Sequence, residues 1–86
     1  MLEDKRKKID EIDEKIVNLL GERTKAAEEI GKEKKQTERD ILDSQREQQV
    51  IDHAKAIAEE KGLEGEFIEE IFKKIMHYSK EKQRKL

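Results

Sequence analysis

The stretch IDEIDEKIVNLLGERTKAAEEI, residues 9–30, places an apolar side chain at nearly every third or fourth position. This spacing matches the turn of an α-helix and predicts one amphipathic helix over about residues 3–37. With a rise of ~1.5 Å per residue, such a helix is about 50 Å long, more than a domain of this mass can wrap around. We therefore expect the helix to cross between two subunits.

A second helix is predicted over about residues 44–61. Ser44 and Glu47 have the spacing of a capping box, and Asp43 is an equally good cap, so the start of this helix is open by one residue. The apolar stripe stops before Gly62, a residue suited to the left-handed backbone that closes many helices.

A third helix, over about residues 65–84, follows the turn GLEGE. Its apolar stripe passes through Phe72, and we expect Met76, Phe67 and Phe72 to lie in the core. The predicted fold is therefore all-α, with one long and two shorter helices per chain. We expect a single domain covering residues 1–86 and a helical homodimer.

The composition agrees with this fold. Ala, Glu, Lys, Leu and Arg account for 47 of the 86 residues, and proline is absent. These are the residues of long helices with charged, solvated faces. A chain of this size buries only about 60% of the surface that it exposes when unfolded, so its stability as a monomer is marginal. This favours a partner subunit.

Charge and residue usage argue against several classes of partner. Charged residues make up 49% of the chain, but the signs are interleaved and the net charge is only −2. We therefore expect no binding to nucleic acid or to a membrane. Without cysteine, and with two histidines far apart in sequence, we expect no metal site. No long apolar run or signal peptide is present, so a cytoplasmic protein is expected.

Polar side chains occupy several positions on the apolar stripes. They are Arg6, Arg23 and Lys34 on the first helix, Glu47 on the second, and Ser79 and Gln83 on the third. An inward-facing cation without a partner is strongly unfavourable, so these cations require anions. Only Glu47 is an obvious internal candidate, which leaves room for a small dianionic ligand.

Helix geometry limits which cations can meet. Arg6 and Arg23 are 17 residues apart, about 25 Å, too far for both to hold one small ligand. Arg23 and Lys34 are about 16 Å apart, and their long side chains can converge on something between them. Arg6 can join only from a second copy of the chain. Antiparallel pairing of two long helices would supply it and would create two identical sites.

Each of these residues also has a simpler interpretation. Arg6 lies in a basic run that solvent alone would explain, and Arg23 could form an interhelical salt bridge. Lys34 could extend out of the helix end. Glu47 could act only as a cap, and Ser79 and Gln83 could mark a frayed helix end.

Three segments favour the functional interpretation of these residues over the simpler one. They are KRKKIDEIDEKIVNLLGERTKAAEEIGKEK, then LDSQRE, then FIEEIFKKIMHYSKEKQ. Together and in this order they resemble the all-helical class of chorismate mutases, over about residues 3–84. The resemblance implies an intertwined homodimer that converts chorismate to prephenate, at the branch toward phenylalanine and tyrosine, by a Claisen rearrangement. Because that reaction is intramolecular, it implies no nucleophile, metal or cofactor.

The resemblance also implies a role for each site residue. Arg23 and the partner subunit's Arg6 would bind the two substrate carboxylates, with Arg46 behind them. Lys34 and Gln83 would donate hydrogen bonds to the ether oxygen. Glu47 would accept a hydrogen bond from the ring hydroxyl, and the backbone near Asp43 would assist it. Ser79 would contact a substrate carboxylate.

Two other functions remain to be distinguished. An isochorismate pyruvate-lyase shares the fold and the cationic pocket, although the carboxylate of Glu47 argues for a mutase. A non-catalytic helical dimerisation module is the second alternative. In such a module, the inward-facing cations would pair with carboxylates of the other chain and bind no dicarboxylate.

Overall fold

A computed structural model of the chain describes residues 1–34 and 43–85, except for the side chain of Lys34. Their regular structure is entirely helical and comprises α1 (Leu2–Lys34), α3 (Ser44–Glu60) and α4 (Gly65–Arg84). The prediction of an all-α chain with one long and two shorter helices is confirmed for this part of the molecule. The expected end of the first helix, near residue 37, lies outside the described residues.

The first turn of α3 is capped differently from the capping box that Ser44 and Glu47 suggested. The N-cap is Asp43, whose carboxylate accepts a hydrogen bond from the backbone N–H of Arg46 at 3.1 Å. Ser44 is already the first helical residue, so it cannot cap, and the Glu47 side chain pairs with another helix instead. The capping-box expectation is therefore wrong, and the alternative cap, Asp43, is the one used.

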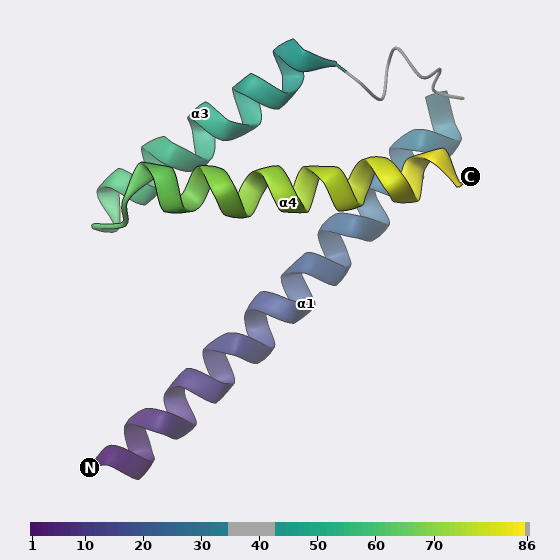
Figure 1. The fold of residues 1–86 in the computed structure, drawn as a ribbon. Helices are drawn as coiled ribbons and strands as arrows, with labels where there is room; N and C mark the ends of the chain where they lie inside the picture. Colours follow the sequence, from purple (N-terminus) through teal and green to yellow (C-terminus); the bar gives the residue numbers. More distant parts are fainter. Residues whose placement is uncertain (35–42, 86) are drawn as a thin grey trace.

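The turn after α3 folds the chain back on itself. Gly62 has a φ of 75°, the left-handed conformation expected of it. The N–H of Leu63 donates to the carbonyl of Ala58 at 2.8 Å, and the N–H of Gly62 donates to that of Glu59 at 3.2 Å. This pair of bonds is a Schellman motif, which satisfies carbonyls that the helix end leaves open. As a result α4 returns alongside α3 (Figure 1).

The core between α3 and α4 is small. Its buried apolar residues are Ile51, Ala54, Ala58 and Met76. Phe72 is partly buried next to them. Phe67, which the sequence placed in the core, is 51% exposed and is a correction to that expectation. It lies in the first turn of α4, where few other residues of the chain can cover it.

Lys55, Glu69 and Lys73 form a charged cluster at the surface of α3 and α4, here called the Glu69 cluster. The carboxylate of Glu69 lies 3.1 Å from the ammonium of Lys55 on α3 and 3.0 Å from that of Lys73 on its own helix. These contacts lower the pKa of Glu69, through the hydrogen bond from Lys73 first and that from Lys55 second.

Among the described residues, only the C-terminal part of α1 packs against another helix, which is α4 (Figure 1). The N-terminal half extends away, and its apolar residues Ile9, Ile12, Ile16 and Leu19 remain exposed. The accessible surface of 7474 Å² compares with about 5,300 Å² for a compact monomer of this mass. The radius of gyration, 15.5 Å, likewise exceeds the ~12 Å of a compact domain. A lone chain is therefore an open structure.

Across residues 1–34 and 43–85, none of the helices is both long and apolar enough to span a lipid bilayer.

Candidate active site

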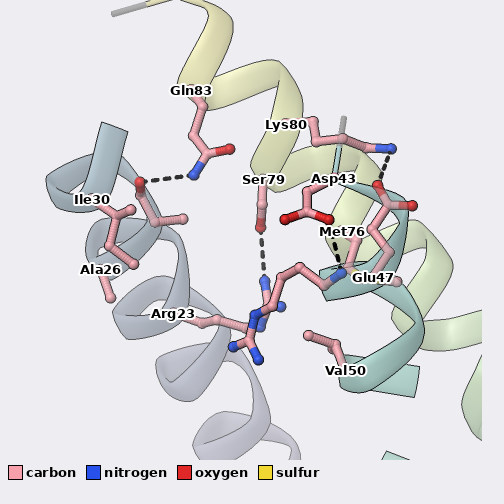
Figure 2. A pocket seen from close by; sticks show the side chains of 12 residues that line it. Arg23, Ala26, Ile30, Asp43, Glu47, Val50, Met76, Ser79, Lys80 and Gln83 are labelled. Atoms are coloured by element: carbon pink, nitrogen blue, oxygen red, sulfur yellow. Dashed lines mark hydrogen bonds and ion pairs between the residues drawn. The ribbon is translucent and has the colours of Figure 1, made fainter. Parts of the chain in front are cut away.

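A pocket of about 320 Å³ lies where the C-terminal half of α1, the start of α3 and the C-terminal half of α4 meet (Figure 2). This volume is at the lower end of the range for small-molecule sites. Six predicted site residues line it: Arg23, Asp43, Arg46, Glu47, Ser79 and Gln83. They come from all three helices and span most of the sequence, and only the tertiary fold brings them together.

Arg23 is oriented in this pocket by a neutral group. Its Nη1 donates to the hydroxyl of Ser79 at 2.8 Å, and that hydroxyl donates in turn to the carbonyl of Ile75 at 3.1 Å (Figure 2). Burial, and then the positive charge of Arg46, lower the pKa of the Arg23 guanidinium. Within the described residues, no carboxylate lies within ion-pairing distance of it. Arg23 is thus a fixed cation that the described residues do not neutralise.

Arg46 adds a second guanidinium. Its backbone N–H bonds to the capping carboxylate of Asp43, but its side chain has no hydrogen bond or ion pair within residues 1–34 and 43–85. Two like charges near one another, neither paired with a carboxylate of the described residues, favour the binding of an anion.

Glu47 also lines the pocket, from the first turn of α3. Its Oε1 lies 2.7 Å from the ammonium of Lys80 on α4, and both side chains are mostly shielded from solvent (Figure 2). The pocket lining thus carries the cations Arg23, Arg46 and Lys80 against the carboxylates of Asp43 and Glu47. The sum of these five side-chain charges is positive.

Gln83 closes the pocket from the end of α4. Its side-chain amide donates one N–H to the backbone carbonyl of Ala27 at 3.1 Å (Figure 2). A primary amide has two N–H donors, so this contact orients the group and leaves one donor for a ligand.

A larger hollow of about 570 Å³ lies between α1 and α4, around Val17, Leu20 and Tyr78. No guanidinium lines it. We therefore place the candidate site in the smaller pocket, where the unneutralised cations are.

Comparison with known proteins decides the family. The family model for chorismate mutase type II matches residues 5–84 of the chain. The chain belongs to the type II chorismate mutases. It is also 33% identical, over 79 residues, to a chorismate mutase of Methanocaldococcus jannaschii, which corresponds to 92% of this chain and 80% of the relative. No solved structure matches the chain. The family resemblance seen in the sequence is confirmed, and the chain is an isomerase-type enzyme.

Two predicted site residues of this chorismate mutase are not in the pocket as described. Arg6 lies on the extended half of α1 and pairs with Glu3 at 3.3 Å, one turn away on the same helix. Within one chain it cannot reach the pocket, as the sequence analysis expected. Lys34 is the last residue of α1, and its side chain lies outside the described part of the structure.

Sequence reasoning missed one charged residue of the mutase pocket, Lys80. It lies four residues after Met76 and three before Gln83, so all three share a face of α4. That spacing was a usable signal. It was overlooked because Lys80 also lies in the charged run SKEKQRK, where a solvated side chain is the ordinary interpretation.

Proposed function

We propose that this chorismate mutase converts chorismate to prephenate in an intertwined homodimer, in the cytoplasm, on the route to phenylalanine and tyrosine. One observation carries the proposal. Arg23 and Arg46 face a metabolite-sized pocket with no carboxylate partner among the described residues. A dianionic substrate neutralises these cations, whereas a purely structural pocket would have paired them within the protein.

Binding restricts the shape of the substrate. Arg23 and the partner subunit's Arg6 each hold one carboxylate, for which the planar guanidinium fork is better suited than an ammonium. Arg46 adds positive charge behind them. With both carboxylates held, the substrate stays in the compact diaxial form from which the rearrangement proceeds. Orientation of this kind can supply most of the roughly 8 kcal/mol that a million-fold acceleration requires.

The transition state gains further stabilisation at the ether oxygen. As the C–O bond breaks, negative charge develops on that oxygen, and the Lys34 ammonium and the free N–H of Gln83 donate to it. A donor placed where charge develops contributes about 3 kcal/mol. Gln83 is neutral, so it needs no prior protonation to donate.

The remaining residues hold the substrate at its other end. Glu47 accepts a hydrogen bond from the ring hydroxyl, with the backbone near Asp43 assisting. Ser79, whose proton bonds to the carbonyl of Ile75, acts on the substrate carboxylate through Arg23 as long as that bond persists.

The exposed half of α1 supports the homodimer. The apolar stripe that ends in the pocket continues toward the N-terminus through Ile16 and Ile9, where one chain leaves it uncovered. The excess surface, about 2,000 Å² over a compact monomer, is enough for one partner's share of an obligate interface. If Arg6 of each copy faces the region midway between Arg23 and Lys34 of the other, the two-fold axis passes near about residue 17.

The experiment is an assay of chorismate disappearance and prephenate formation by the purified protein, beside sedimentation equilibrium. We expect turnover by a dimer. A parallel incubation with isochorismate tests for salicylate and pyruvate, which would indicate the lyase. Calorimetry with a bicyclic dicarboxylate transition-state mimic tests the non-catalytic alternative. A dimer that neither turns over chorismate nor binds the mimic would disprove the proposal.

A further inference from the structure

The Glu47–Lys80 contact is an ion pair built into the wall of the pocket. Glu47 lies in the first turn of α3, yet its side chain turns toward α4 and places Oε1 at 2.7 Å from the Lys80 ammonium (Figure 2). The two side chains are 32% and 23% exposed, so solvent screens the pair less than an ordinary surface pair. The contact therefore restrains both side chains.

Location separates this pair from the other ion pairs of the described chain. Lys55, Glu69 and Lys73 form similar pairs on the surface of α3 and α4, but none of them lines the pocket. Lys80 follows Ser79, which holds Arg23, and precedes Gln83 by one turn. The pair thus joins α3 to α4 at the pocket itself.

The geometry leaves half of the Glu47 carboxylate available. Oε1 is occupied by Lys80, while Oε2 has no partner among the described residues. A glutamate on a pocket wall without a fixed partner would sample several rotamers, and a ligand would have to order it on binding. Removing Lys80 would also leave the carboxylate uncompensated beside a bound dianion.

We propose that Lys80 is a positioning residue for Glu47. It holds one carboxylate oxygen against the pocket wall, so that the other is already placed to accept a hydrogen bond from the substrate hydroxyl. This inference rests on the proposed function for the identity of that hydroxyl, but the ion pair itself does not. Because the hydroxyl is not a reacting group, the contact acts equally on the bound substrate and the transition state, and its loss raises KM more than it lowers kcat.

The kinetic test is a double-mutant cycle with Lys80→Met, Glu47→Gln and the double variant, each assayed with chorismate. We expect Lys80→Met to raise KM about tenfold with kcat within about threefold of the parent. In the Glu47→Gln background, the same change should alter kcat/KM by less than about twofold, because the group that Lys80 positions is gone. Lys80→Arg should restore most of the loss, since it keeps the charge.

Lys73→Met is the matched control, because it removes a Lys–Glu pair of the same helix outside the pocket. We expect its KM to stay within about twofold of the parent. A merely structural role for Lys80 would instead lower the fraction of active enzyme, and so kcat, at unchanged KM. That result, or an equal loss from Lys80→Met with and without Glu47, would overturn the proposal.

A readout independent of turnover separates this inference from the proposed function. In lysine-selective ¹⁵N NMR, we expect a protected ammonium signal for Lys80 that disappears in Glu47→Gln. If the signal behaves in this way but the parent does not convert chorismate, the ion pair stands and the assigned reaction fails. If the signal is absent from the parent, the positioning role of Lys80 is wrong.

Discussion

Ser79 has a role that the pattern on α4 did not reveal. The direct contact with a substrate carboxylate that the sequence suggested stays a prediction, and the structure adds that the Ser79 hydroxyl lies between Arg23 and the carbonyl of Ile75. A carboxylate at this position would have oriented Arg23 as well, but would also have neutralised it. A hydroxyl orients the guanidinium and leaves its charge for a ligand. At the scale of single residues, the proposed binding of a dianion relies on this difference.

Arg23→Lys should lower kcat/KM at least about a hundredfold, because an ammonium cannot contact Ser79 and grip a carboxylate with a planar fork at the same time. Steady-state kinetics with chorismate measure this loss, and circular dichroism checks that the helices persist. Arg84→Lys makes the same change outside the pocket and should leave kcat/KM within about twofold. A loss of less than about threefold in Arg23→Lys would contradict the assigned role.

Lys34→Ala should lower kcat by at least about a hundredfold with the dimer intact, because the ether oxygen loses its charged donor. The assay is single-substrate kinetics combined with size-exclusion chromatography. Lys32→Ala, an exposed lysine two residues earlier on α1, is the control and should retain the parent kcat. If Lys34→Ala keeps kcat within a few-fold of the parent, the proposed contact to the ether oxygen is wrong.

At the scale of elements, α3 and α4 form the most extensive helix contact of the described residues, and α1 joins them through α4. The Schellman turn at Gly62 sets their antiparallel course, and the Glu69 cluster ties them together at the surface. The pocket depends on this pair, because α4 carries Ser79, Lys80 and Gln83 to α1 and α3.

Gly62→Ala should destabilise the protein by about 1 kcal/mol, because a side chain at a φ of 75° strains the backbone. Urea denaturation at fixed protein concentration measures the change. Gly65→Ala is the control, since the φ of Gly65 is not positive and its new Cβ would meet only the Lys55 side chain, at 3.1 Å from Cε and 3.9 Å from Cγ. We expect this control to stay within about 0.5 kcal/mol. Equal free energies of unfolding for Gly62→Ala and the parent would show that the left-handed backbone at residue 62 does not strain an alanine.

The pKa of Glu69 predicts a pH dependence of stability. The folded state lowers this pKa, so it favours the ionised carboxylate. The stabilisation is fully present above the pKa of Glu69 in the unfolded state. It is lost as the pH falls through the lower pKa of Glu69 in the folded state. Glu69→Gln should therefore lower Tm at neutral pH, and the difference from the parent should shrink on acidification below about pH 4.

The control for Glu69→Gln is Glu70→Gln, an exposed neighbour on the same helix. Its Tm should follow that of the parent throughout the titration. A Tm difference between Glu69→Gln and the parent that stays constant from neutral to acidic pH would show that the charge of Glu69 does not stabilise the fold.

At the scale of the whole molecule, a single chain leaves much of its apolar surface exposed. The described residues include only four buried apolar ones, and no side chain among them is fully buried. Half of α1 presents an apolar stripe to solvent, and Arg6 lies on that half. In the proposed homodimer, a second copy of the chain covers this stripe and brings its Arg6 to the pocket.

Ile16→Glu should dissociate the proposed dimer and abolish turnover, because it places a charge in the covered stripe and removes the partner subunit's Arg6 from the pocket. Sedimentation equilibrium and the chorismate assay measure the two effects together. Asn18→Glu adds the same charge to the other side of α1 and should leave both unchanged. A monomeric parent, or an Ile16→Glu variant that stays dimeric and active, would rule out this arrangement.

Much of the fold and the site could be predicted from periodicity. The stripe on α1 predicted a long helix, the apolar runs after it predicted α3 and α4, and Gly62 predicted their turn. The inward-facing cations pointed to an anionic ligand because charge on an apolar face needs a partner. Periodicity could not decide between Ser44 and Asp43 as the cap, because both suit that position and only backbone geometry distinguishes them.

The sequence by itself determined which helices form, which face of each is apolar, and the family to which the chain belongs, since these follow from local spacing and residue identity. The tertiary structure alone decided the contacts: Ser79 with Arg23, Lys80 with Glu47, and the exposure of Phe67. The physical reason is that periodicity places a side chain on a face of its own helix. Which group it meets depends on how another helix, many residues away, approaches that face.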